Sequence, residues 1–294
     1  MFARRKIVKA VIPAAGFGTR MLPATKALPK EMLPVAGKPL IQHAVEEAVA
    51  SGIETVILVV RSRLSLVQAH FAPDPALEAF LRERGLVVAA EQMNSLNELA
   101  NLQYVEQKKP LGLAHSISCA RPLVGEEPFV VLLPDVIIVT DEPVTRQLIR
   151  AHEQHGGSVI AIREVESHEV ERHGIVGIER STEFRSSKPV RVTGLVEKPS
   201  PADAPSQFGV FGRYLLEPAI WDVIAQTKAD AWGEVQLTDA LNLLCQTGLL
   251  FGLCFKGHHY DAGDRLGYVK ANLELFLRVP QLRPILLEYL SHLQ

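Results

Sequence analysis

The densest group of residues that could bind phosphate lies near the N-terminus. Gly16 and Gly18 form a glycine-rich turn after a short β-prone run, and the cations Arg20, Lys26 and Lys30 follow. Glycine has no side chain, so backbone amides in this turn can approach a phosphate chain or a base. Prolines between the cations prevent a regular helix and favour a rigid irregular loop. Positive charge held rigidly beside a glycine turn suits a triphosphate, because arginine can bind two oxygens at once.

The glycine pair alone leaves other interpretations open. A dinucleotide-binding oxidoreductase also uses Gly-x-Gly, but its fingerprint has a third glycine where this chain has Met21, and it lacks the cations that follow here. The cations could equally form a solvated basic loop without a ligand. The turn therefore permits phosphate binding without establishing it.

Two aspartates occupy positions that suit a metal ion. Asp135 follows Pro134 at the end of the apolar run 129–133, and Asp261 begins an Asp-Ala-Gly segment before a helical pattern. Mg²⁺ prefers a few carboxylates together with phosphate oxygens. A helix N-cap or a turn would use an aspartate in the same way, so both roles remain open.

Glu197 and Lys198 follow the predicted strand 190–196. A carboxylate can accept hydrogen bonds from two hydroxyls, and an ammonium group meets a phosphate as a point charge. Taken alone, Glu-Lys-Pro is also an ordinary exposed turn. The pair suits a sugar phosphate only if other elements bring it to the glycine turn.

The elements that must position these residues alternate between strand and helix. Buried strands are predicted at 7–12, 55–60, 129–133 and 158–165, and helices at 39–51, 64–71, 75–84, 112–121 and 144–155, with a polar segment before a strand at 102–106. Strand, helix, strand is the βαβ unit of a parallel sheet, whose ligands bind at the carboxyl ends of the strands. The glycine turn and Asp135 are expected at that edge.

After residue 166 the pattern changes to shorter strands of alternating polarity, at 175–178, 190–196 and 208–216. These indicate an antiparallel portion inserted in or appended to the core. Helices at 217–226 and 237–246, a strand at 249–255 and amphipathic helices from about 266 complete the chain. We predict an α/β fold with a Rossmann-like mixed, mainly parallel sheet flanked by helices, a smaller antiparallel portion and C-terminal helices.

The amino-acid composition limits the classes of partner that the protein is expected to bind. The 294 residues include 31 basic and 33 acidic side chains, so no broad basic field for nucleic acid is expected. The three cysteines lack CxxC spacing, which argues against a disulfide framework or a zinc site. No apolar run reaches the length of a transmembrane helix. We expect a cytoplasmic protein that binds neither nucleic acid nor membrane.

The stretch 10–34, which contains the glycine turn and its cations, closely resembles the nucleotide-binding signature of bacterial UTP–glucose-1-phosphate uridylyltransferases, within the sugar-nucleotidyltransferase family. The resemblance covers roughly residues 7–272, in the family's order. It returns at Gly112-Leu-Ala-His-Ser, Leu133-Pro-Asp-Val-Ile137, His173-Gly-Ile-Val176, Val196-Glu-Lys-Pro199, Gly212-Arg-Tyr214, Gly233-Glu-Val-Gln-Leu-Thr-Asp239 and Tyr260-Asp-Ala-Gly263.

This resemblance implies transfer of UMP from UTP to glucose 1-phosphate, with Mg²⁺ as cofactor, in a homo-oligomer (a dimer or a tetramer). It also implies a nucleotidyltransferase domain at 1–272, whose sugar-binding portion is about 166–235, and a C-terminal helical extension at 273–294.

The resemblance further assigns roles to matching positions. Catalysis falls to Arg20, Lys30, Asp135 and Lys198. Nucleotide binding falls to Ala15, Gly16, Gly18, Thr19, Gln107 and Gly112. Sugar binding falls to Gly174, Glu197, Lys198 and Glu234, and metal binding to Asp135 and Asp261.

Three departures from the family pattern leave alternatives open. Ala114 adds a methyl group where the family has glycine, which keeps dTTP possible as a donor. Trp232 stands where a small residue is usual and could narrow the sugar pocket, and the segment between Arg84 and Gln107 is shorter than usual. A nucleotidyltransferase of broader range and a catalytically weak regulatory paralogue that binds UDP-sugar are the other interpretations.

Overall fold

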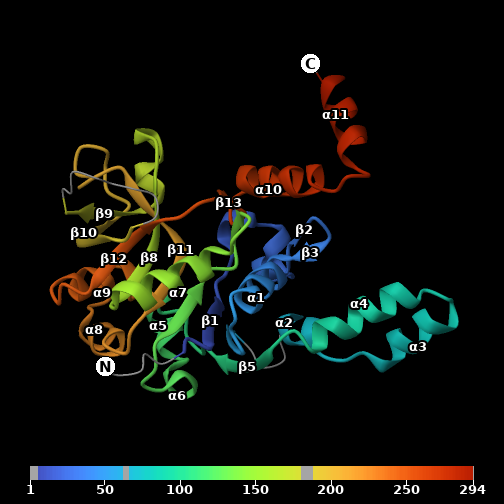
Figure 1. Cartoon of the computed structure of the whole chain (residues 1–294), viewed down its shortest axis with the longest axis horizontal. Helices are drawn as coiled ribbons and strands as arrows, with labels where there is room; N and C mark the ends of the chain where they lie inside the picture. Colours follow the sequence, from blue (N-terminus) through green and yellow to red (C-terminus); the bar gives the residue numbers. More distant parts are fainter. Residues whose placement is uncertain (1–5, 62–65, 180–187, 294) are drawn as a thin grey trace.

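A nine-stranded mixed sheet forms the centre of the molecule (Figure 1). The computed structural model describes residues 6–61, 66–179 and 188–293. The strand order is β5-β4-β1-β6-β11-β8-β12-β10-β9. In the first half, β5 (Asn101–Glu106), β4 (Thr55–Val60), β1 (Lys9–Ala14) and β6 (Phe129–Leu132) are parallel. All of β6 and most of β1 and β4 are buried, as expected for strands covered on both faces.

The second half of the sheet brings the antiparallel strands into the core. Strand β11 (Phe208–Leu216) lies antiparallel between β6 and β8 (Ser158–Glu164), and β12 (Leu250–Cys254) runs parallel to β8. Strand β10 (Val190–Glu197) pairs with β12 and with β9 (Gly174–Ile178), which also pairs with β11. The antiparallel portion is therefore continuous with the parallel one.

Helices cover both faces of the sheet. One apolar cluster joins α1 (Leu40–Ala50) and α7 (Val144–His155) to residues such as Ile12 and Leu58. The opposite cluster joins α5 (Leu113–Ser118), α8 (Ile220–Gln226) and α9 (Leu237–Cys245) to residues such as Val11 and Ile57. Successive residues of β1 and β4 thus serve opposite cores, in keeping with the period of two in a strand.

Short elements shape the edge where the strands end. The cation loop forms three 3-10 turns, η1 (Thr19–Met21), η2 (Ala24–Lys26) and η3 (Lys30–Met32), and the small hairpin of β2 (Pro34–Val35) and β3 (Lys38–Pro39) follows. Strand β7 (Val136–Val139) pairs antiparallel with β13 (His258–Asp261), with Val136 opposite Asp261. Neither strand was predicted. Their pairing brings the two aspartates of the sequence analysis together.

Two further predictions need correction. The polar segment after residue 84 contains a helix, α4 (Val87–Asn97), which packs with α3 (Pro75–Glu83) as a hairpin that projects from the body beyond α2 (Leu66–Phe71) (Figure 1). The predicted helix at 112–121 is instead α5 followed by α6 (Arg121–Val124), with a turn at Cys119 and Ala120. A 3-10 helix, η4 (Ser167–Arg172), precedes β9.

The C-terminal helices extend away from the sheet (Figure 1). Helix α10 (Arg265–Leu277) begins at Asp264, whose side chain accepts a hydrogen bond from the Gly267 amide, as in an N-cap. The division proposed after residue 272 falls within this helix. Helix α11 (Arg283–Ser291) has no buried residue. Within the described ranges, no helix is both long and apolar enough to cross a membrane.

Candidate active site

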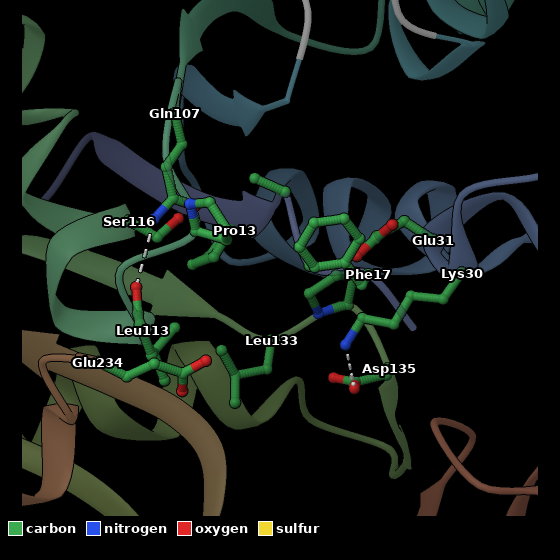
Figure 2. A pocket seen from close by; sticks show the side chains of 15 residues that line it. Pro13, Phe17, Lys30, Glu31, Gln107, Leu113, Ser116, Leu133, Asp135 and Glu234 are labelled. Atoms are coloured by element: carbon green, nitrogen blue, oxygen red, sulfur yellow. Dashed lines mark hydrogen bonds and ion pairs between the residues drawn. The ribbon is translucent and has the colours of Figure 1, made fainter. Parts of the chain in front are cut away.

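Two pockets adjoin at the carboxyl ends of β1 and β6. The first, of about 290 Å³, includes Ala15, Gly16, Lys30, Gln107 and Gly112 in its lining (Figure 2). The second, of about 330 Å³, is lined among others by Arg20, Gly174, Glu197, Lys198 and Asp261. Asp135, Leu113 and Leu133 line both pockets. A ligand spanning the two pockets would pass the Asp135 carboxylate.

The turn after β1 needs glycine for a steric reason. Gly18 has φ +64°, and a Cβ at this position would lie 2.9 Å from Cβ of Lys30. The Thr25 hydroxyl donates a 2.7 Å hydrogen bond to the Gly18 carbonyl. These contacts fix the loop that carries Lys30 against the turn. Gly18 and Thr19 shape this loop, although neither is among the described residues that line the two pockets.

The end of the first pocket that lies away from Lys30 is formed around Gln107, which is 5% exposed. Its Nε2 atom donates to Nδ1 of His115 at 2.9 Å and to the Gly112 carbonyl at 3.4 Å. Gly112 has φ +94°, and a Cβ there would lie 2.6 Å from the Val235 carbonyl oxygen. The side chain of Gln107 and the backbone of Gly112 are thus held in place, and both present polar groups to one end of the pocket.

Four charged side chains meet where the pockets join. Lys30 Nζ lies 2.7 Å from Asp135 Oδ2, and Arg20 lies 3.0 Å from Asp261 and 3.8 Å from Asp135. Burial alone would raise the pKa of Asp135, but Lys30 and Arg20 outweigh it and hold that pKa below its usual value. Burial would lower the pKa of Lys30, but the negative charges of Asp135 and Glu31 outweigh it and raise that pKa. Both groups are therefore charged at neutral pH.

The aspartate pair suits a magnesium ion shared with substrate. A Cβ on Gly263 would lie 2.8 Å from Asp135 Oδ2 and 2.9 Å from Asp261 Oδ1, so oxygens of both carboxylates converge on one point. The described part of the chain contains no group of three or more His, Cys, Asp or Glu side chains that could hold a metal. Mg²⁺ commonly takes one or two carboxylates and completes its shell with water and phosphate oxygens, which this donor set allows.

The turn that carries Asp135 is held by a buried arginine to which the sequence assigned no role. Arg213 is 2% exposed and donates to the carbonyls of Leu133 (3.0 Å) and Val136 (2.9 Å), on either side of Asp135. Its guanidinium also makes a two-point contact with Glu47, with Nε–Oε1 at 3.0 Å and Nη2–Oε2 at 2.8 Å. An arginine inside the apolar run 208–216 was the signal available, since a buried cation needs a partner.

The second pocket contains the Glu197–Lys198 pair. Glu197 Oε2 accepts a 2.6 Å hydrogen bond from the Thr238 hydroxyl, and a Cβ on Gly174 would lie 3.2 Å from the same oxygen. Lys198 has φ +45°, and its Nζ lies 3.5 Å from Glu197 Oε1. With a side chain that is 60% exposed, Lys198 remains open to a ligand.

Glu234, which was assigned to the sugar, does not line the second pocket, and the two substitutions Ala114 and Trp232 lie outside both pockets. Glu234 is exposed and lines the first pocket, whereas its neighbours Gln236 and Thr238 line the second. Trp232 is 90% exposed, and Ala114 is fully buried in the apolar core. Among the described residues, neither belongs to the lining of either pocket.

Comparison with known proteins gives consistent matches over nearly the whole chain. A family model described as nucleotidyl transferase matches residues 9–276. The UTP–glucose-1-phosphate uridylyltransferase YngB of Bacillus subtilis is 43% identical over 288 residues, covering 98% of this chain and 96% of the relative. UTP–glucose-1-phosphate uridylyltransferase 2 of Staphylococcus saprophyticus is also 43% identical, over 99% of both chains.

Solved structures agree with these matches. A UTP-bound UGPase from Acinetobacter baumannii has a TM-score of 0.90 and 34% identity, covering 98% of this chain and all of the other. A UDP-glucose pyrophosphorylase complexed with UDP-glucose has a TM-score of 0.83 and 35% identity, over 92% of this chain and 99% of the other. The resemblance read from the sequence motifs is thereby confirmed.

Proposed function

The chain belongs to the nucleotidyl transferase family, and from this premise we propose that it transfers UMP from UTP to glucose 1-phosphate, giving UDP-glucose and pyrophosphate. The observation that carries the proposal is the pair of pockets that share Asp135. We assign the first as the nucleotide pocket and the second as the sugar pocket. The junction between them is where a phosphate of each substrate would meet. The names of the similar proteins and their bound UTP and UDP-glucose support this assignment.

In the nucleotide pocket, uracil would be held by the backbone of Ala15 and Gly16, the amide of Gln107 and the backbone of Gly112. An amide side chain carries both a donor and an acceptor, which the edge of uracil requires. Gly18 and Thr19 would keep the loop in shape beneath the triphosphate.

In the sugar pocket, Glu197 would accept hydrogen bonds from glucose hydroxyls, and Lys198 would contact the sugar phosphate. Gly174 would allow the sugar to approach the backbone. Glu234 lies on the nucleotide side, so any contact of Glu234 with the sugar would come from the rim between the pockets.

Transfer of UMP requires that the phosphates of the two substrates be positioned and that their negative charge be neutralised. An oxygen of the sugar phosphate attacks the α-phosphorus of UTP, the new O–P bond forms, and the bond to the β-phosphate oxygen breaks to release pyrophosphate. Because a phosphate monoester has a second pKa of about 6, the nucleophile is already ionised and no general base is required. Arg20 and Lys30 would bind the triphosphate oxygens, and Lys198 would bind the attacking phosphate.

Members of this family generally use a divalent metal, and we propose Mg²⁺ for this chain. Asp135 and Asp261 would hold the ion, which when bound supplies positive charge to the phosphate oxygens. Lys30 and Arg20 pair with these carboxylates in the free protein. Once the carboxylates have a metal, the two cations would be available to the substrate.

We also propose a cytoplasmic homo-oligomer, a dimer or a tetramer, whose subunit contacts involve the C-terminal helices. Side chains of α10 and α11 leave apolar surface exposed, including Leu266, Val269, Ile285 and Tyr289 at 60–63% exposure. Burial of such a surface against a second copy is favourable. The division at 1–272, with sugar binding at about 166–235, and 273–294 remains our proposal for the organisation of the chain.

The proposal is tested by pyrophosphate release with glucose 1-phosphate and Mg²⁺, with UTP and dTTP compared side by side. Fast release with UTP and little with dTTP is expected. A preference for dTTP would instead indicate a thymidylyltransferase that uses the same site. No release with either nucleotide would favour a regulatory paralogue that binds UDP-sugar.

A further inference from the structure

The base end of the nucleotide pocket contains a buried hydroxyl that the transfer mechanism does not use. Ser116, on α5, is 4% exposed and lines the pocket, and its Oγ atom has no hydrogen-bond partner in the described part of the chain. Buried polar atoms are normally paired, because an unpaired one loses its hydration without compensation. The free protein therefore holds an unused hydrogen-bond donor at one end of this pocket.

The contacts around Ser116 explain why its hydroxyl remains unpaired. A serine inside a helix can bond back to the carbonyl four residues earlier, which here is that of Gly112. That carbonyl already accepts hydrogen bonds from the Ser116 backbone amide at 3.1 Å and from Gln107 Nε2 at 3.4 Å. A carbonyl oxygen has two lone pairs, so both are occupied. The Ser116 hydroxyl is thus left for a group that enters the pocket.

Gln107, beside Ser116, shows which hydrogen bond a base would still need. Its Nε2 atom donates to Nδ1 of His115 at 2.9 Å as well as to the Gly112 carbonyl, so a ligand meets this side chain through the Oε1 acceptor. In uracil, the N3–H donor lies between two carbonyl oxygens. When Oε1 accepts from N3–H, the neighbouring carbonyl oxygens need donors, and the Ser116 hydroxyl can supply one.

The position of Ser116 in the pocket indicates which of the two carbonyl oxygens it would meet. Figure 2 shows Ser116 at the same end as Gln107, whereas Lys30 and Asp135 lie at the other end, which we assign to the phosphates. In a uridine nucleotide the ribose is attached to N1, next to the carbonyl at C2. The carbonyl at C4 lies across the ring from N1. It is therefore the part of the base farthest from the phosphates, and it would reach the end that holds Ser116.

We propose that the Ser116 hydroxyl donates a hydrogen bond to the 4-oxygen of the base, and that Ser116 thereby helps to select the donor nucleotide. This inference rests on the proposed function, because it takes the first pocket as the nucleotide pocket. It does not depend on whether UTP or dTTP is preferred, since both carry the 4-oxygen.

The experiment measures kcat/KM with UTP, 4-thio-UTP and 2-thio-UTP for the wild-type protein, Ser116→Ala and Ser118→Ala. Sulfur accepts hydrogen bonds more weakly than oxygen does, so each analogue weakens the contact to one of the two carbonyl positions. In Ser116→Ala the preference for UTP over 4-thio-UTP should fall by roughly two- to tenfold, mainly through loss of activity with UTP. The preference for UTP over 2-thio-UTP should stay at its wild-type value.

Ser118→Ala is the matched control for Ser116→Ala. Ser118 lies on the same helix, donates to the His115 carbonyl at 2.8 Å and is not among the described residues that line the two pockets. Its variant should keep both wild-type preferences. Because Ser116→Ala removes a buried hydroxyl that has no partner in the free protein, its free energy of unfolding should not fall. Urea denaturation checks that the variant is folded.

Binding of UTP and 4-thio-UTP without glucose 1-phosphate, measured by calorimetry, separates this inference from the transfer reaction. If no UDP-glucose forms while Ser116→Ala still reduces the preference for UTP in binding, the proposed transfer fails and the role of Ser116 stands. An unchanged preference for UTP over 4-thio-UTP in Ser116→Ala overturns the inference. So does an equal change in the preferences over 4-thio-UTP and 2-thio-UTP, since that result indicates a structural effect on the whole base site.

Discussion

The two lysines assigned to phosphate lie in contrasting surroundings. On the nucleotide side, the side chain of Lys30 is 21% exposed and pairs with buried Asp135 at 2.7 Å. On the sugar side, the side chain of Lys198 is 60% exposed and lies 3.5 Å from Glu197, which is itself accessible. The nucleotide side is thus preorganised by buried pairs, whereas the sugar side is open. We expect changes on the first side to affect transition-state stabilisation or folding, and changes on the second to affect mainly substrate binding.

The largest expected effect comes from breaking the buried pair that holds the Asp135 turn. Arg213→Met should lower the free energy of unfolding by about 3–5 kcal/mol, because it leaves the Glu47 carboxylate buried without its cation. Urea denaturation followed by circular dichroism measures this loss. The double variant Glu47→Gln/Arg213→Met should recover part of the stability but not the activity, since the carbonyls around Asp135 still lack their donor. Recovery of full activity in the double variant would contradict a role in positioning Asp135.

Lys30→Ala should reduce kcat by roughly 10²–10³-fold, because it removes a preorganised cation from the reacting phosphates. The free energy of unfolding should also fall, because buried Asp135 loses its nearest cation, but by less than in Arg213→Met, since Arg20 remains 3.8 Å from Asp135. Lys26→Ala is the matched control, since Lys26 lies in the same loop, is exposed and is not among the described residues that line the two pockets. Steady-state rates of pyrophosphate release, with folding checked by circular dichroism, compare the two variants. Near-normal turnover in a well-folded Lys30→Ala protein would refute this assignment.

Glu31→Gln should change the pH dependence of stability. The wild-type pKa of about 7 lies above the ordinary value of 4.5, so the free energy of unfolding falls as pH rises from about 4.5 to about 7 and the buried carboxyl ionises. Glutamine does not ionise, and the variant should exceed the wild type by about 3 kcal/mol at pH 8. The difference should shrink as the pH is lowered towards 4.5. Denaturation curves across this range measure it, and a difference independent of pH would argue against a buried, ionising Glu31.

The smallest expected effect comes from a substitution in the more exposed sugar pocket. Lys198→Ala should raise KM for glucose 1-phosphate by roughly tenfold, which corresponds to the loss of about 1.4 kcal/mol. The KM for UTP should change little, because Lys198 lines only the second pocket. Initial rates with each substrate varied in turn measure both constants. A fall in kcat as large as that of Lys30→Ala would erase the proposed difference between the two sides.

The strength of the local apolar pattern determines which parts of the fold could be predicted from the sequence. Strand β4 and helix α7 match the predictions at 55–60 and 144–155, because each carries a strong apolar pattern. Helix α4 was missed because its first four residues, 87–90, are all apolar and the rest are mostly polar, so its apolar residues do not form one stripe at helical spacing. Strand β7 was missed because it has four residues and pairs with β13, more than a hundred positions away.

The residues of the site also differ in how far their roles could be predicted from the sequence. Residues of local motifs, such as Gly18 and Asp135, could be placed from sequence because their neighbours in the chain define them. Glu31 and Arg213 could not be given roles, because their importance depends on burial and on partners from distant elements.

We propose that the two pockets bring UTP and glucose 1-phosphate together at Asp135 for direct transfer. The most direct test of this proposal is to mix the protein with UTP, glucose 1-phosphate and Mg²⁺ and to follow all phosphorus species by ³¹P NMR. We expect UDP-glucose and pyrophosphate in equal amounts, with neither formed when glucose 1-phosphate is left out. Pyrophosphate release without the sugar phosphate, or consumption of UTP without UDP-glucose, would contradict it.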